Sequence, residues 1–297
     1  MAELRSTVAL YPGCSLTGSA SGFAVSANHV LDVLGIACPT LDDWTCCGAS
    51  SAHALDHRLH LALNLRNLAL AEQQGFCELL VPCAACYHRL AATAYELDQD
   101  PELRAQLNTE TGFNYQGTVA VRNVLDFLTR DVGVDAIGER VVEPLAGLKV
   151  ACYYGCLNTR IPRRECFDDR EYPTSMDTLV RALGAEPIDW SYKTECCGAS
   201  LFISQESVSA RLVSRILKDA VARGAGCVAV ACPMCHNNLD TKQDHVRAEF
   251  SIARPMPIVF ITQLIGLAFG LTKSELKLGH SFVPFQFAPS AKEPVLT

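Results

Sequence analysis

Two identical strings in this 297-residue chain carry most of its possible chemistry. Residues 46–50 and 196–200 both read Cys-Cys-Gly-Ala-Ser, each with one cysteine upstream and a Cys-x-x-Cys downstream. Packing alone gives no reason for such a repeat, whereas metal binding does. Ten of the 15 cysteines therefore form two sets in the same order: Cys14, Cys46, Cys47, Cys83 and Cys86, then Cys156, Cys196, Cys197, Cys232 and Cys235.

The spacing of the cysteines agrees between the two halves of the chain. Between the upstream cysteine and the double cysteine lie 31 residues in the first half and 39 in the second. Between the double cysteine and the Cys-x-x-Cys lie 35 and 34 residues. The one large difference is explained by an insertion at Arg160–Thr174, so the chain reads as an internal duplication.

The residues beside the cysteines favour a shared cofactor in each half. Two adjacent cysteines diverge on a strand or a helix, so both reach one cofactor only if the backbone turns sharply, which Gly48 and Gly198 permit. Pro82, before Cys83, and Pro233, after Cys232, favour non-helical backbone at the strand ends. Soft thiolates suit iron–sulfur clusters, zinc or Cu(I). Zinc and ordinary cubane clusters take four ligands, so five thiols indicate a larger or less regular group.

The other five cysteines are excluded as ligands. Free cysteine is a common small core residue, and this is the favoured interpretation for them. Cys152, for example, aligns with Leu10 within an expected strand. For the ten cysteines of the two sets, metal binding is favoured over a role as core residues. A zinc site in one of the two lobes remains an alternative. The excluded residues are Cys38, Cys77, Cys152, Cys166 and Cys227.

Composition narrows the class of protein. A hydrophobic content of 49% with 19% charged residues is typical of a packed globular protein, and a net charge of −7 argues against a general nucleic-acid binder. The longest apolar tract, Ile258–Leu271, is shorter than a membrane-spanning helix and contains Thr262 and Gln263. With no signal peptide recognised and an odd cysteine count, we expect a cytoplasmic protein without a disulfide framework.

Strand and helix signals recur in the same order in both halves. An apolar strand precedes the upstream cysteine, and the helix after it ends at a glycine. A long helix should follow each double cysteine, with Leu55, Leu59 and Leu63 sharing a face in the first half. The expected strands are Thr7–Tyr11, Leu79–Pro82, Leu148–Tyr153 and Val228–Ala231, and the expected helices include Ser19–Leu34, Val119–Thr129 and Ser175–Leu183.

This alternation predicts an α/β fold of two pseudo-symmetric lobes with mainly parallel sheets, each carrying one cysteine set. The ligands should then lie at the carboxyl ends of the strands, where α/β sheets usually bind ligands. We place an N-terminal lobe at residues 1–96, a connector at 97–146, a C-terminal lobe at 147–280 and a tail at 281–297.

Histidines accompany the cysteines and have two interpretations. His88 follows Cys86 by two residues and His236 follows Cys235 directly, so either is a candidate proton donor, although a structural role is favoured. His53, His57 and His60 share a helical face, which suggests either a metal site or, as we prefer, a solvated face.

Over nearly its whole length the sequence resembles the B-type subunit family of heterodisulfide reductase, cysteine-rich proteins with two Cys-Cys-Gly (CCG) motifs. The likeness includes Tyr11-Pro12-Gly13-Cys14, the Pro-Cys-Ala-Ala-Cys-Tyr of residues 82–87, the Pro-Thr-Ser-Met-Asp of residues 173–177, Thr194–Ser200, Cys232-Pro233-Met234-Cys235 and Thr262–Leu267. The Cys-Cys-Gly motif alone is shared with components of glycolate oxidase, lactate-utilisation and anaerobic glycerol-3-phosphate dehydrogenase complexes. The flanking strings narrow the match to the B-type family, including its sulfur-oxidising relatives.

The resemblance implies that each five-cysteine set holds one non-cubane [4Fe-4S] cluster, with all ten ligands present. It also implies disulfide or sulfane-sulfur redox chemistry between two clusters, on a heterodisulfide or on lipoyl-bound sulfur. Partners of the flavin-containing A-type and the cubane-cluster C-type would supply or remove electrons. Two rivals remain: a non-catalytic electron-transfer subunit of a dehydrogenase complex, and a zinc-stabilised interaction protein.

Overall fold

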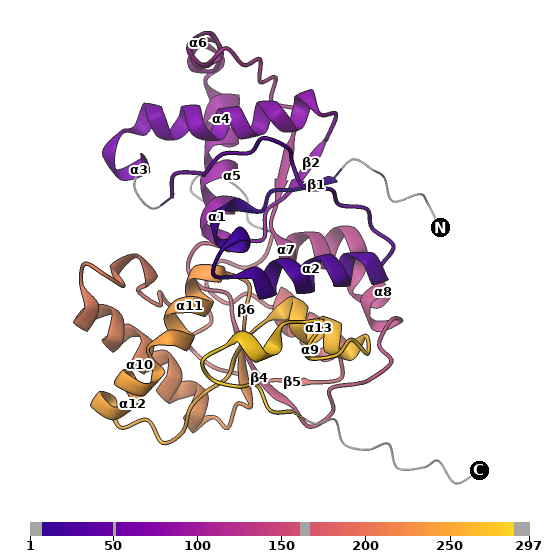
Figure 1. The fold of residues 1–297 in the computed structure, drawn as a ribbon, viewed down its shortest axis with the longest axis vertical. Helices are drawn as coiled ribbons and strands as arrows, with labels where there is room; N and C mark the ends of the chain where they lie inside the picture. Colours follow the sequence, from indigo (N-terminus) through magenta and orange to yellow (C-terminus); the bar gives the residue numbers. More distant parts are fainter. Residues whose placement is uncertain (1–7, 50–51, 161–166, 288–297) are drawn as a thin grey trace.

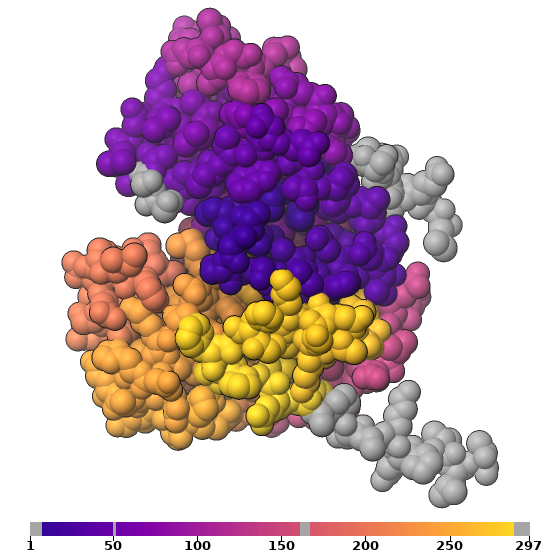
Figure 2. All heavy atoms as spheres, viewed as in Figure 1, coloured from indigo at the N-terminus to yellow at the C-terminus, as the bar shows by residue number. Residues whose placement is uncertain are grey.

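The computed structural model describes residues 8–49, 52–160 and 167–287 of the chain. It is an α/β structure with two parallel sheets, as the sequence predicts (Figure 1). Residues 161–166, which belong to the first half of the predicted insertion and include Cys166, and residues 288–297 of the predicted tail lie outside the described residues. The surface is hollowed between the indigo and violet N-terminal half and the orange C-terminal half (Figure 2).

The N-terminal sheet has three strands in the order β1-β2-β3, and all neighbours are parallel. Strands β1 and β2 end shortly before Cys14 and Cys83. The elements of this half are β1 (Val8–Leu10), α1 (Gly13–Thr17), α2 (Ser21–Val33), α3 (Ala52–Leu55), α4 (His57–Gln73), β2 (Glu78–Leu80), α5 (Ala84–Gln99), α6 (Pro101–Thr111) and β3 (Ala120–Arg122).

The C-terminal sheet has four parallel strands in the order β5-β4-β6-β7. Its elements are β4 (Lys149–Tyr153), α9 (Ser175–Ala182), β5 (Glu186–Pro187), the 3₁₀ turn η2 (Ala199–Leu201), α10 (Glu206–Ala222), β6 (Cys227–Val230), α11 (Pro233–Thr241), α12 (Gln243–Phe250), β7 (Ile258–Phe260), α13 (Ile261–Ala268) and η3 (Leu278–His280). Between the sheets lie α7 (Val124–Asp126), the π-helix η1 (Phe127–Gly133) and α8 (Val134–Gly138).

The internal repeat extends to the sheet topology. Strands β1, β2 and β3 correspond to β4, β6 and β7 in order and direction. Strand β5 pairs with β4 at the sheet edge, and a single parallel bridge between Leu10 and Thr40 occupies the matching position beside β1. Strand β3 lies within the segment 97–146 that the sequence suggests as a connector, yet it pairs with β2.

Two expectations about helices need correction. The helix expected at Val119–Thr129 is wrong at its start, because Ala120–Arg122 form strand β3, where Val121 is buried in the core. The face with Leu55 and Leu59 is exposed, at 82% and 49%, and α4 packs through Leu61, Leu65 and Leu68 instead. In both places tertiary packing overrides the local pattern.

The two halves are joined by helices that pack across the boundary. Helix α2 of the first half packs on α13 of the second, and Phe23 stacks on Phe260, the last residue of β7, with ring centroids 4.4 Å apart. Ser26 and Thr262 share a buried hydrogen bond of 2.6 Å beside them. Reciprocally, α9 of the second half packs on α7 and α8, which follow β3. Each half therefore covers a helix of the other.

Candidate iron–sulfur site

The cysteines follow the carboxyl ends of strands, as expected. Cys14 and Cys83 come shortly after β1 and β2, and Cys156 and Cys232 come shortly after β4 and β6. Cys83 and Cys232 are the N-cap residues of α5 and α11, so both Cys-x-x-Cys motifs begin a helix. A helix N-terminus favours the thiolate form of cysteine, which is the form that binds metal. The pKa of Cys83 is lowered, whereas the hydrogen bond with Cys83 and burial raise the pKa of Cys232 to about 12.

The turn at each double cysteine has the geometry that the glycines predict. Gly48 and Gly198 have φ of +71° and +80°, a region that favours glycine. Their backbone N–H groups donate to the sulfur atoms of Cys46 and Cys196 at 3.4 and 3.3 Å. The first cysteine of each pair is exposed and the second is buried, so the turn sends adjacent thiols in different directions.

In the N-terminal set, thiols meet in two groups. The Sγ atoms of Cys47 and Cys86 are 3.2 Å apart, and Cys86 also interacts with Cys83. Cys14 and Cys46 interact with each other. The hydrogen bond between Cys47 and Cys86 lowers the pKa of Cys47 to about 7. A thiolate is therefore accessible near neutral pH in this set.

The C-terminal set repeats these contacts. Cys235 interacts with both Cys197 and Cys232, and Cys156 pairs with Cys196. The hydrogen bond from Cys156 lowers the pKa of Cys196 to about 6. All five cysteines line one cavity of about 80 Å³. Ala84 of the N-terminal half also lines this cavity, so the site lies at the boundary between the lobes.

The two cysteine sets touch each other. The thiols of Cys83 and Cys232 interact across the lobe boundary, and the pKa of Cys83 is lowered chiefly by its hydrogen bond with Cys232. The duplication thus places the two sets next to each other rather than at opposite ends of the molecule.

Glycines bring the backbone unusually close to two sulfur atoms. A Cβ added at Gly13 would lie 3.0 Å from Cys86 Sγ, and one at Gly155 would lie 3.1 Å from Cys235 Sγ. Both glycines have positive φ, +59° and +69°. Five soft donors around a small cavity, with backbone at van der Waals distance, fit an iron–sulfur cluster. In the described ranges, no group of three or more His, Cys, Asp or Glu side chains is spaced to hold a single metal ion, which is a different requirement from that of a cluster of several irons.

Two pairs of positioning residues hold the double-cysteine loops. Tyr11 and Tyr153 donate from their buried phenols to the carbonyls of Thr45 and Glu195, at 2.6 and 2.5 Å. The sequence pattern includes both tyrosines beside the upstream cysteines but gives no role for them.

The second pair consists of two buried asparagines. Asn64 and Asn238 donate to the carbonyls of Cys47 and Cys197 at 3.1 and 2.7 Å. They come from non-equivalent helices, α4 and α11, so the internal repeat contains no signal that could have found them.

The two candidate proton donors are buried near the cysteines. Burial lowers the pKa of His88 and of His236 to about 4, so each is a neutral imidazole near neutral pH. His236 stacks on Phe260 with ring centroids 4.3 Å apart. His60 is only 4% exposed, so the solvated face expected for His53, His57 and His60 is wrong for its last member.

Of the cysteines set aside as ligands, two lie in the core. Cys152 and Cys227 are fully buried in the neighbouring strands β4 and β6, as the strand-core interpretation of Cys152 predicts. Burial raises the pKa of both thiols. Cys38 is half-buried and Cys77 is exposed.

Fold and site together define a duplicated α/β protein with two adjoining thiol sites at strand ends. Its sequence matches the CCG cysteine-rich domain twice, at residues 8–91 and 150–240. It is 33% identical to the B-type subunit of a CoB-CoM heterodisulfide reductase from Methanosarcina acetivorans, over 93% of each chain. It is 34% identical to the 8-methylmenaquinol:fumarate reductase membrane anchor subunit of Wolinella succinogenes, over 94% of this chain and 98% of that one.

The chain belongs to the CCG cysteine-rich family and is a homologue of the B-type subunit of heterodisulfide reductase, which makes it an iron–sulfur redox protein. A solved structure of a hypothetical protein from Helicobacter pylori shares the fold, with a TM-score of 0.76 at 14% identity. That match covers 95% of this chain and spans about half (53%) of the solved chain. Within the described residues, every helix is too short or too polar to span a membrane.

Proposed function

We propose that this chain is the iron–sulfur subunit of a heterodisulfide-reductase-like complex and acts on a disulfide or sulfane-sulfur bond. The observation that supports this most is the contact between Cys83 and Cys232, which puts two five-cysteine sets side by side. Splitting a disulfide takes two electrons and yields two sulfur products. Two adjoining metal sites match that requirement, whereas one site alone suits a simple electron carrier.

In this proposal each five-cysteine set holds one non-cubane [4Fe-4S] cluster. When bound, the two clusters supply two one-electron centres and iron atoms that accept sulfur. The protein holds the two clusters through ten cysteines: Cys14, Cys46, Cys47, Cys83, Cys86, Cys156, Cys196, Cys197, Cys232 and Cys235.

The surrounding residues exclude water and orient the ligands. Ala84, Leu157 and Met234 give the C-terminal cavity apolar walls. His88 and His236 are the proposed proton donors; burial keeps both imidazoles neutral near neutral pH, so each would take up a proton before it donates one. The proposed electron partners are the flavin-containing A-type and cubane-cluster C-type proteins, and cytoplasm is the proposed location.

The test is anaerobic preparation followed by metal analysis and electron paramagnetic resonance. Two clusters predict about eight irons and eight acid-labile sulfides per chain. Addition of a substrate disulfide, including a lipoyl-bound one, should change the resonance of the oxidised clusters. Stoichiometric zinc in place of iron, or no turnover of any thiol or disulfide by the reconstituted complex, would overturn the proposal.

A second candidate function is favoured by the fumarate reductase relative. Its full-length match at 34% identity suggests an electron-transfer subunit that passes electrons between a quinol and a partner enzyme. Such a subunit would carry the same clusters but bind no sulfur substrate. Cluster reduction by a menaquinol analogue, with a resonance that no disulfide alters, would favour this function over the first.

A further inference from the structure

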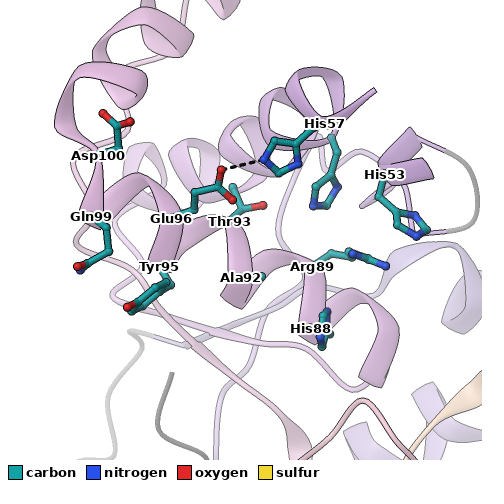
Figure 3. Close-up of a pocket in the computed structure, with 11 residues that line it drawn as sticks. His53, His57, His88, Arg89, Ala92, Thr93, Tyr95, Glu96, Gln99 and Asp100 are labelled. Atoms are coloured by element: carbon teal, nitrogen blue, oxygen red, sulfur yellow. Dashed lines mark hydrogen bonds and ion pairs between the residues drawn. The ribbon is translucent and has the colours of Figure 1, made fainter. Parts of the chain in front are cut away.

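An arginine lies beside the N-terminal cysteine set, at a position that the internal repeat fills with asparagine in the other half. Arg89 follows Cys86 by three residues on α5, and Asn238 follows Cys235 by three residues on α11. Residues three apart lie on one face of a helix, so the side chain of Arg89 leaves α5 on the side of Cys86. It lines a wide cavity beside the N-terminal cysteine set, between helices α3, α4 and α5, where Figure 3 shows it extending toward His53.

The asparagine of the C-terminal half has a structural task that a different helix performs in the N-terminal half. Asn238 of α11 donates to the carbonyl of Cys197 at 2.7 Å. The carbonyl of Cys47 receives the matching hydrogen bond from Asn64 of α4, at 3.1 Å. The position three residues after the Cys-x-x-Cys is therefore not needed for that contact in the N-terminal half, and Arg89 occupies it.

The guanidinium of Arg89 is half-buried and faces a thiol rather than a carboxylate. Among the described residues, Arg89 forms no ion pair with an acidic side chain. The two carboxylates that line the cavity are engaged elsewhere: Glu96 pairs with His57 at 2.8 Å, and Asp100 caps helix α6. The group that interacts with the guanidinium is Cys47, so the counter-charge of Arg89 is a sulfur of the proposed ligand set.

The C-terminal cysteine set faces a charge of the opposite sign. Glu195 directly precedes the double cysteine, at a position where the other half has the uncharged Thr45. The hydrogen bond with Cys156 is the main cause of the lowered pKa of Cys196, and the negative charge of Glu195 acts against it. Glu195 is exposed, so water and salt screen its charge more than that of the half-buried Arg89.

Two further electrostatic contributions are shared by the two sets. Each Cys-x-x-Cys begins a helix, whose N-terminus carries a partial positive charge. Gly48 and Gly198 donate to the first sulfur of each double cysteine at nearly the same distance, 3.4 and 3.3 Å. The buried Lys193 of the C-terminal lobe is paired with Asp177 at 2.7 Å and adds no net charge. Because a nearby positive charge stabilises an added electron and a negative charge opposes it, the N-terminal set holds an electron more easily than the C-terminal set.

We infer that Arg89 makes the N-terminal cluster the more easily reduced of the two, so that the first electron to enter the pair is held in the N-terminal half. The inference rests on the proposed function, because it requires one cluster in each cysteine set. The step is a one-electron transfer: the electron-donor protein of the complex is oxidised by one electron and the N-terminal cluster is reduced by one, with no bond made or broken. Arg89 acts on this step through Cys47, as a residue that sets the potential and need not touch the substrate.

Anaerobic redox titration with sodium dithionite, followed by electron paramagnetic resonance in the absence of any sulfur substrate, measures the two potentials of the cluster-loaded chain. Arg89→Gln should lower the higher potential and leave the lower one unchanged. The expected change is at least about tenfold in the ratio of reduced to oxidised cluster, or about 59 mV for a one-electron couple. Arg89→Lys keeps the charge and should retain most of the potential. Glu195→Gln should raise the lower potential by a smaller amount, because Glu195 is exposed.

Arg211→Gln is the matched control, since Arg211 is exposed on α10 in the other lobe, and it should leave both potentials unchanged. A second measurement keeps Arg89 in place and assigns the potentials to the lobes. Cys197→Ser should keep the N-terminal cluster and Cys47→Ser the C-terminal one, and the cluster kept by Cys197→Ser should have the higher potential.

The inference is overturned if Arg89→Gln holds both clusters and shifts neither potential, if it shifts both equally, or if the cluster kept by Cys197→Ser has the lower potential. A chain that binds no iron would overturn the inference together with the proposed function. Arg89-dependent potentials in a complex that turns over no disulfide would sustain the inference and count against the proposed chemistry. Disulfide turnover with potentials that Arg89→Gln does not move would overturn the inference alone.

Discussion

The N-terminal cysteine set adjoins a wide cavity lined by histidine and arginine, whereas the C-terminal set lines a small cavity with alanine, leucine and methionine walls. A shallow groove with Phe202, Ile203 and Met234 continues outward from the second cavity, and Ile203 is 92% exposed. The thiols, glycines and tyrosines are the same in both halves. The duplication has therefore kept the arrangement of the cysteines and changed the residues that surround them.

The support behind the two sites differs as well. In the C-terminal lobe, Lys193 and Asp177 form a buried ion pair at 2.7 Å, and Tyr154 donates to the same carboxylate at 2.6 Å. In the N-terminal lobe, the ion pair before the double cysteine joins Arg66 to Asp43, whose side chain is 76% exposed. The C-terminal loop is thus held by a desolvated network and the N-terminal loop by a solvated one.

The largest expected effect comes from removing one ligand in each lobe. If each cysteine set holds one cluster, as proposed, Cys47→Ser and Cys197→Ser should each lose one cluster and leave the other, so that iron falls to about half in both. Cys152→Ser, at a buried non-ligand, is the control and should keep full iron. Loss of all iron in either ligand variant would show that the two sites assemble as one unit, and unchanged iron would remove that cysteine from the ligand set.

The next largest effect concerns the buried ion pair. Lys193→Met leaves Asp177 charged and buried, so unfolding free energy should fall by about 3–5 kcal/mol. Arg66→Met breaks the exposed pair and should cost no more than about 1 kcal/mol. Denaturant unfolding of both variants measures the difference, and equal costs would contradict the contrast between the lobes.

Glycine substitutions separate backbone strain from crowding at the clusters. Gly13→Ala and Gly155→Ala place a methyl group against a cysteine sulfur, in addition to a strain of about 1–3 kcal/mol from positive φ. Gly35→Ala and Gly224→Ala have the same kind of strain, with no atom within 4 Å of the new Cβ. Only the first two should reduce iron content. Equal iron in all four would argue that the close approach is unimportant.

The smallest expected effect, for a change of one pH unit, is the pH dependence from His236. Burial lowers its pKa to about 4, while the unfolded chain has an ordinary value near 6.5, so the unfolded state binds more protons between these values. Stability is therefore lost as pH falls from about 6.5 to 4, by less than about 1.4 kcal/mol per pH unit. His236→Gln should flatten that slope relative to the parent. His245→Gln, at an exposed residue, should leave it unchanged.

The duplication, the parallel sheets and the glycine turns could be predicted because they depend on local signals that occur twice. The identity of β3 could not be, since Ala120–Arg122 form a strand only through pairing with β2. The roles of Asn64 and Asn238 could not be predicted either, because their side-chain amides donate to carbonyls 17 and 41 residues away in the sequence. The cavity beside the N-terminal cysteine set forms where helices α3, α4 and α5 meet. The periodicity of a single helix does not predict which helices pack together.

The packing of each half against a helix of the other half suggests how the duplicated chain evolved. Phe23 of α2 is completely buried, and its stacking partner Phe260 lies 237 positions later. A polypeptide with only one repeat would leave that aromatic face in water. Two such polypeptides could cover each other by the same exchange, as an isologous homodimer. Fusion of the two genes would then keep the architecture and free each copy to diverge, which a dimer of identical chains cannot do.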